Sequence, residues 1–217
     1  MYFFDYPCFN CGSVIKYTQF ILKGSVMPSA LIHLLTGRYF KPDGSIPYFI
    51  GTVAPDCVGE RVTKDHTHLR DRSDRHEAII ELRDSFDLGD DYQLGALLHL
   101  YTDMLWDEGL QKEYRDSYPE PDNAWFRPYR NEISLASAYI FHRSDWGEPL
   151  WREMLECPDA LFDSLTDFPA EAVRGYLTRN FKWHYENDVG PSEVYPPATV
   201  DEFCRGAAES FSRFLNQ

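Results

Sequence analysis

His99 and Asp103 lie four residues apart and carry an imidazole and a carboxylate, two groups that bind divalent metal ions. Residues 94–106 are apolar on nearly every side, so we expect them to form a buried helix. Residues at this spacing face the same side of a helix, about 5–6 Å apart at Cβ, and can reach one ion. A buried carboxylate is costly unless a cation compensates it. The alternative explanation is a hydrogen bond between the two side chains inside the core.

Three earlier segments contain residues of the same kinds. His33 is expected in the first helix, Asp56 follows a proline after an apolar run, and a polar loop carries His66 and His68. Taken singly, these residues have ordinary explanations as a core histidine, a turn and a solvated loop. Taken together, they supply the mixture of histidine and carboxylate that zinc favours, with oxygen atoms available for further ions.

These candidates belong to four short motifs that follow one another along residues 27–107. The motifs read Met27-Pro-Ser-Ala-Leu-Ile-His33, Phe49-Ile-Gly-Thr-Val-Ala-Pro-Asp56, Thr67-His68-Leu-Arg70 and Leu94-Gly-Ala-Leu-Leu-His99-Leu-Tyr-Thr-Asp103-Met-Leu-Trp106. In content and order they resemble the small bacterial proteins of the zinc-dependent phospholipase C family. The wider superfamily includes secreted phospholipases C and fungal single-strand nucleases.

The resemblance implies a zinc centre with two ions expected and one to three compatible. It assigns as ligands His33, Asp56, His68, His99 and Asp103, of which Asp103 is able to bridge two ions. His68 is preferred to His66 because it heads the third motif. Secreted members add their mature N-terminal amine and a downstream histidine and carboxylate cluster. The downstream candidates in this chain lack the matching context: they are His142, His184 and Asp188.

The implied reaction is hydrolysis of a small phosphoester, in which a metal-activated water attacks phosphorus. Asp56 is the candidate catalytic residue that orients this water or accepts its proton. Arg70 is a candidate phosphate clamp, with a solvated loop arginine as the alternative. An HD-type phosphohydrolase is a competing hypothesis, although no adjacent His-Asp pair occurs in the chain. A metal-stabilised binding or regulatory protein without catalysis is the other alternative.

The composition of the chain limits the kinds of partner that we expect it to bind. The chain has 217 residues, a 43% hydrophobic content and a formal net charge of −14, which disfavours nucleic-acid duplexes and anionic membrane surfaces. We expect no membrane insertion, because no apolar run reaches the length of a bilayer span. Five cysteines are too few and too irregular for a disulfide framework, and no secretory signal is recognisable, so we expect a cytoplasmic protein. The sequence does not predict the oligomeric state.

Helical spacing recurs along the chain, whereas sustained strand alternation is absent, so we predict an all-α bundle around the buried metal site. Expected helices cover residues 29–40, 74–85, 91–106, 125–142, 148–155 and 170–185, with a polar loop at 60–72. Capping boxes at Asp74 and Thr199 are expected to start two helices, the second being the last in the chain. Residues 27–217 are predicted to form one domain. Residues 1–26 are interpreted as an extension upstream of a natural start at Met27.

Overall fold

We describe the fold from a computed structural model that covers residues 30–119 and 124–217. Within these ranges the protein has ten α-helices, two 3-10 helices and no strand, which confirms the all-α prediction. The expected extension over residues 1–26 and the expected helix cap Ser29 lie outside the described residues. The elements are α1 (Ala30–Phe40), α2 (Ile46–Gly51), η1 (Ala54–Cys57), α3 (Arg61–Thr67), α4 (Arg75–Ser85), α5 (Asp91–Glu108), α6 (Leu110–Ser117), α7 (Phe126–Arg143), α8 (Gly147–Glu156), η2 (Asp159–Leu161), α9 (Ala170–Glu186) and α10 (Pro197–Phe214).

Most helices begin and end close to their predicted bounds. Asp74 caps α4, because its carboxylate accepts a hydrogen bond from the Glu77 N–H at 3.0 Å. The predicted start of the last helix at Thr199 is wrong. That helix, α10, begins at Pro197, since proline has no N–H to lose and its fixed φ suits the first helical turn.

The segment predicted as a polar loop, residues 60–72, differs most from expectation. Residues 61–67 form α3, because the Glu60 carboxylate accepts a hydrogen bond from the Thr63 N–H at 2.9 Å and caps the helix. The sequence also did not predict α6. None of the residues of α6 is buried, so it offers no core-facing apolar stripe.

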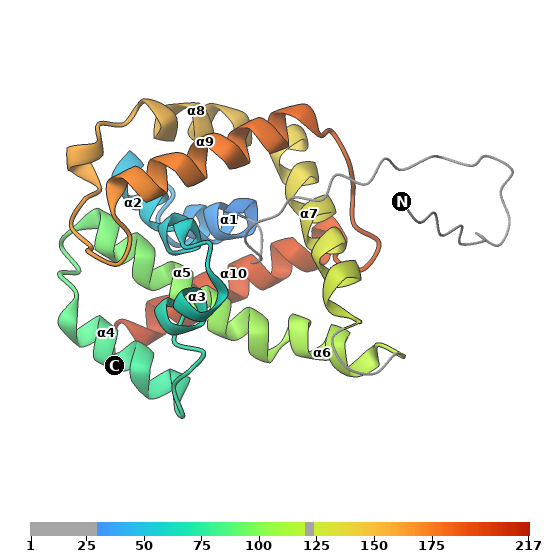
Figure 1. Cartoon of the computed structure of the whole chain (residues 1–217), viewed down its shortest axis with the longest axis horizontal. Helices are drawn as coiled ribbons and strands as arrows, with labels where there is room; N and C mark the ends of the chain where they lie inside the picture. The colour runs from blue at the N-terminus through green and yellow to red at the C-terminus, as the bar shows by residue number, and fades with distance from the viewer. Residues whose placement is uncertain (1–29, 120–123) are drawn as a thin grey trace, which may run out of the picture.

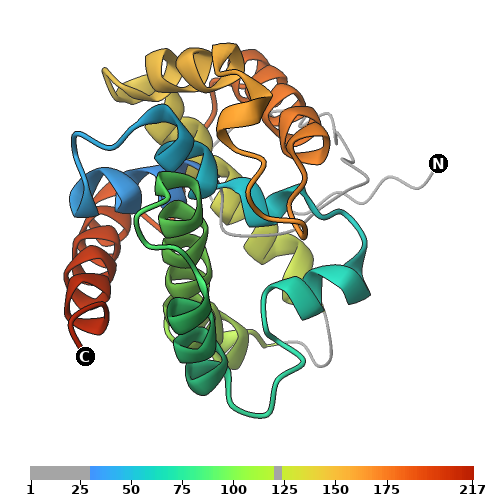
Figure 2. The ribbon, with the colours of Figure 1, turned by 90° about the vertical axis from the view of Figure 1, so that its left-hand side faces the viewer.

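Helix α5 occupies the middle of the arrangement, where the green ribbon runs between α1, α2 and α10 (Figures 1 and 2). It packs against α1, α2, α4, α6, α10 and η1. The side chains of His99 and Asp103 are therefore completely buried, although they face away from the main apolar stripe of the helix. The predicted burial of this helix is confirmed.

A close contact between α2 and α5 fixes the wall of the site. A Cβ atom at Gly51 would lie 2.2 Å from the Tyr92 carbonyl oxygen, and one at Gly95 would lie 2.2 Å from the Tyr48 carbonyl oxygen. Only glycine permits this approach of two backbones. The contact brings the end of α2, and with it the Thr52 carbonyl, up to the face of α5 that carries His99.

Apolar clusters cover α5 on two sides. The larger joins α1, α2, α5, α8 and α9, and the smaller surrounds Trp106, whose indole N–H donates to the Tyr129 hydroxyl at 2.7 Å. These contacts hold α7 and α10 against the central helix. Among the described residues, no helix is both long and apolar enough to cross a membrane.

Candidate metal centre

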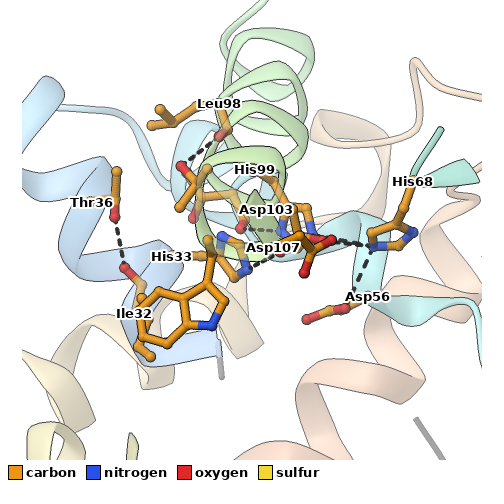
Figure 3. A network of polar contacts seen from close by, with 12 residues as sticks. Ile32, His33, Thr36, Asp56, His68, Leu98, His99, Asp103 and Asp107 are labelled. Carbon is orange, nitrogen blue, oxygen red and sulfur yellow. Dashed lines mark hydrogen bonds and ion pairs between the residues drawn. The ribbon is translucent and has the colours of Figure 1, made fainter. Parts of the chain in front are cut away.

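Five of the predicted ligands converge from separate parts of the fold. Figure 3 shows their side chains meeting between α1, η1, the end of α3 and α5. None of the five exposes more than 2% of its surface; they are His33, Asp56, His68, His99 and Asp103. The sequence thus predicted a set of residues that the fold does bring together, although they are separated by up to 70 positions along the chain.

Asp56, His68 and His99 form one group of potential ligands whose donor atoms lie within 4.8 Å of one another, and Asp103 Oδ2 lies close to two of them. His68 Nε2 lies 3.4 Å from His99 Nε2, 3.7 Å from Asp56 Oδ1 and 3.6 Å from Asp103 Oδ2. His99 Nε2 lies 3.7 Å from the same Asp103 oxygen. Two nitrogen ligands of a tetrahedral zinc ion, each about 2.0–2.1 Å from the metal, are about 3.3–3.4 Å apart. The separation of the two imidazole nitrogens therefore matches that of two ligands of one such ion.

The two histidines are oriented as metal ligands usually are. His99 Nδ1 donates to the Thr52 carbonyl at 2.9 Å, and His68 Nδ1 donates to the Lys64 carbonyl at 2.9 Å. Because a carbonyl only accepts, each Nδ1 carries the hydrogen and each Nε2 presents a lone pair. Two lone pairs that face each other at 3.4 Å repel unless a cation or a proton lies between them. Burial, with His33 adding to it, lowers the pKa of His99 to about 3, so a proton is a poor occupant at neutral pH.

His33 lies on the other side of the Asp103 carboxylate. Its ring stacks on that of His99 at 3.8 Å between centroids, and its Nε2 lies 3.3 Å from Asp103 Oδ1. Neither ring nitrogen makes a well-formed hydrogen bond to the described part of the chain. His33, His99 and Asp103 form a second group of potential ligands. Since His99 offers only Nε2, the two groups share that donor, and only one of them can use it for an ion.

A buried ammonium group stabilises Asp56. Lys64 Nζ lies 2.8 Å from Asp56 Oδ1, and the Tyr176 hydroxyl donates to Asp56 Oδ2 at 3.3 Å. Burial alone would raise the pKa of this carboxyl, but Lys64, with the neighbouring histidines, holds it well below its ordinary value. Asp56 is therefore ionised, as a metal ligand must be.

Arg70 links Asp103 to a third carboxylate, Asp107, at the edge of the site, and Arg75 also contacts Asp107. Arg70 Nη2 lies 3.3 Å from Asp103 Oδ2 and 2.8 Å from Asp107 Oδ2, and Arg75 Nη1 donates to the same Asp107 oxygen at 2.8 Å. Burial opposes ionisation of Asp103, yet His99, His33 and Arg70 lower its pKa below the ordinary value. With 24% of its side chain exposed, Arg70 lies between the buried ligands and solvent. It is therefore not the solvated loop arginine of the alternative interpretation.

The backbone between His68 and Arg70 has an unusual conformation. Leu69 has a φ of 59°, in the left-handed region that side chains other than glycine rarely adopt. This turn ends α3 and lets His68 and Arg70, two positions apart, both approach Asp103. Strain of this kind, about 1–2 kcal/mol, is commonly retained where a site requires it.

The remaining candidates lie elsewhere. His66 is exposed and contacts Asp71, while His142 Nε2 donates to the His184 carbonyl at 2.7 Å. His184 is buried, and its ring contacts Ser137 and Asn180. Asp188 is exposed and pairs with Arg143. None of these candidates joins a group of potential ligands in the described ranges.

Four contributors to the site were not predicted: Lys64, Arg75, Asp107 and Tyr176. Two of them carried a usable signal, because Lys64 precedes His68 by four residues and Asp107 follows Asp103 by four, which places each pair on one helix face. Arg75 and Tyr176 reach the site only through the tertiary fold. No local pattern in the sequence identifies them.

Comparison with known proteins adds no further assignment. Family models, curated proteins and solved structures gave no match to this chain. The resemblance to the zinc-dependent phospholipase C family consequently remains a prediction that depends on the four motifs.

Proposed function

We propose that this protein is a zinc-dependent hydrolase of small phosphoesters. The observation that carries the proposal is the meeting of His68 Nε2 and His99 Nε2 at 3.4 Å, each oriented by a hydrogen bond from its Nδ1 to a backbone carbonyl. Asp56 Oδ1 and Asp103 Oδ2 complete a set of four donors. The geometry favours one ion at this set of donors. A second ion, which the sequence predicts, would have to be held by His33 and Asp103 Oδ1 together with solvent or further ligands.

The chemistry follows from the ion and from the charged groups around it. When bound, zinc lowers the pKa of a water molecule to about 7 and offsets charge on phosphoryl oxygens. Asp56 orients the attacking water, a role in keeping with a carboxyl whose proton affinity Lys64 keeps low. Arg70, at the exposed edge, binds phosphoryl oxygens through its planar guanidinium.

Two measurements test the proposal together. Metal analysis of the purified protein is expected to give one zinc per chain. Activity is measured as hydrolysis of p-nitrophenyl phosphate and of bis-p-nitrophenyl phosphate. His99→Ala should remove both the zinc and the activity. His76→Ala is the matched control, since His76 is exposed on α4 and pairs with Glu108 at the surface. Zinc retained in full by His99→Ala would contradict the assignment.

A closed structural zinc site is the second candidate. The burial of the four donors favours it, because structural zinc is surrounded by four protein ligands whereas catalytic zinc keeps a position for water. Stoichiometric zinc without turnover of either substrate, together with a lower melting temperature after chelation, would support this alternative. The HD-type hypothesis shares the histidine and aspartate chemistry but lacks its adjacent His-Asp pair.

A further inference from the structure

The charged groups at the metal centre form a chain of ion pairs that is balanced only when the ion is absent. Ion pairs link three carboxylates to three cationic side chains: Lys64 with Asp56, Arg70 with Asp103 and Asp107, and Arg75 with Asp107. Their formal charges cancel. A divalent ion among the same donors leaves an excess of two positive charges in a region shielded from water. The loaded site requires an anion, and one with two negative charges restores the balance among the linked groups.

Unused hydrogen-bond donors lie beside Arg70. Arg75 exposes 12% of its side chain, and its Nη1 donates to Asp107, but its Nε and Nη2 are buried and have no acceptor in the described part of the protein. Buried guanidinium N–H groups without acceptors are costly. Two such donors in one plane match two oxygens of a phosphoryl group.

We infer that the natural ligand of the loaded centre is a phosphomonoester, whose dianionic phosphoryl group is bound between zinc and the guanidinium groups of Arg70 and Arg75. This inference rests on the proposed function and narrows its substrate class. A phosphomonoester carries close to two negative charges at neutral pH, because its second pKa is about 6, whereas a phosphodiester carries one. The excess of two charges therefore favours the monoester.

The test measures binding, so it does not depend on turnover. Zinc-loaded protein, freed of excess metal, is titrated at pH 8 with methyl phosphate and with dimethyl phosphate in a calorimeter. Methyl phosphate should bind at least about tenfold more tightly, and the metal-free protein, whose charges cancel, should bind neither. Equal affinities for the two probes, or binding of methyl phosphate by the metal-free protein, would overturn the inference.

Arg75→Gln examines the guanidinium directly, because Arg75 does not contact any of the proposed ligands. We expect it to retain one zinc per chain and to bind methyl phosphate roughly tenfold to hundredfold more weakly, as a lost charged hydrogen bond predicts. Arg152→Gln, an exposed residue paired with Glu148, is the matched control and should bind like the wild type. Arg75→Lys keeps the charge and the pairing with Asp107, and serves if the Gln variant fails to fold.

The possible outcomes distinguish a failure of this inference from a failure of the proposed function. A wild-type chain that does not take up zinc would contradict the proposed function itself. A zinc-loaded chain that binds methyl phosphate with the same affinity in the wild type, Arg75→Gln and Arg75→Lys would leave the zinc centre intact and overturn only the role of Arg75.

Discussion

Two pairs in this protein have the same spacing, His99 with Asp103 on α5 and His184 with Asp188 near the end of α9, but their surroundings differ. Helix α5 continues past Asp103, so both side chains of the first pair are buried on one face. Helix α9 ends at Glu186. Asp188 therefore leaves the helix face and pairs with Arg143 at the surface. Spacing alone does not create a site unless the helix extends through both residues.

The hydrogen bonds of the two histidines differ in the same way. His184 Nδ1 donates to the Asn180 carbonyl at 2.8 Å, and its Nε2 accepts from the Ser137 hydroxyl at 2.7 Å, so both nitrogens are satisfied. Nε2 of His99 instead faces another imidazole nitrogen. Burial lowers the pKa of both residues, to about 4 for His184 and about 3 for His99. A neutral buried histidine is therefore common to both regions, and of the two only His99 has an Nε2 that belongs to a group of potential metal ligands within the described part of the chain.

The largest predicted effect is the loss of zinc affinity when the charge of Asp103 is removed. The same change at Asp188 serves as the comparison. Asp103→Asn keeps the shape of the side chain but loses its charge, and should weaken zinc binding more than about a hundredfold, since changes in residues around a ligand already cost tenfold to hundredfold. Asp188→Asn should not change the affinity. Competition with a chromogenic zinc chelator measures both. Equal affinities in the two variants would remove the distinction between the pairs.

Removing zinc should lower the melting temperature of the protein, and a substitution at His184 should not alter the size of that effect. With free zinc at a hundredfold of its Kd, binding to the folded state contributes about 2.7 kcal/mol, which corresponds to roughly 5–10 °C in melting temperature for a domain of this size. Scanning calorimetry with and without a chelator measures the shift. His184→Gln should lower the melting temperature under both conditions but leave the chelator-induced shift unchanged. If the chelator has no effect on the wild type, the centre does not hold zinc.

Much of the fold followed from the sequence because its signals are local. Apolar stripes at helical spacing and caps such as Asp74 are read from neighbouring residues, and they predicted α1, α4, α5, α7, α8 and α9. The failures at α3 and α6 have a common cause. Both helices are short and mostly exposed, so no stripe reveals them, and α3 depends on a cap by Glu60 outside the usual pattern.

The metal centre was predictable only as far as residue type allows. His33, Asp56, His68, His99 and Asp103 could be listed because imidazoles and carboxylates are scarce in apolar segments. That His68 and not His66 faces the centre is consistent with the preference drawn from the motifs, while the positions of Lys64 and Tyr176 depend on how α3 and α9 pack on η1. Sequence spacing contains no information on such contacts.

The pH dependence of stability should report on His184. Its pKa falls from 6.5 to about 4 on folding, so the unfolded chain binds more protons between these values, and stability decreases as the pH falls through this window. Between pH 7 and pH 5 the loss is about 2 kcal/mol. Urea unfolding of the wild type and His184→Gln at both pH values isolates this contribution. A wild type and variant that lose the same stability would show that His184 is not kept neutral by the core.

The smallest effect concerns the hydroxyl that orients Asp56. Tyr176→Phe removes a 3.3 Å hydrogen bond to Asp56 Oδ2 without changing the volume of the side chain, and should lower zinc affinity about tenfold, at the weak end for a group that supports a ligand. Tyr92→Phe is the matched control, since Tyr92 is buried and its hydroxyl donates to the Phe168 carbonyl at 2.9 Å, a contact that involves none of the ligands. Both variants should lose about 1 kcal/mol of unfolding free energy in the metal-free state. Only Tyr176→Phe should alter the zinc affinity, because a ligand carboxylate held in place by a second hydrogen bond has less orientational freedom to lose when the ion binds.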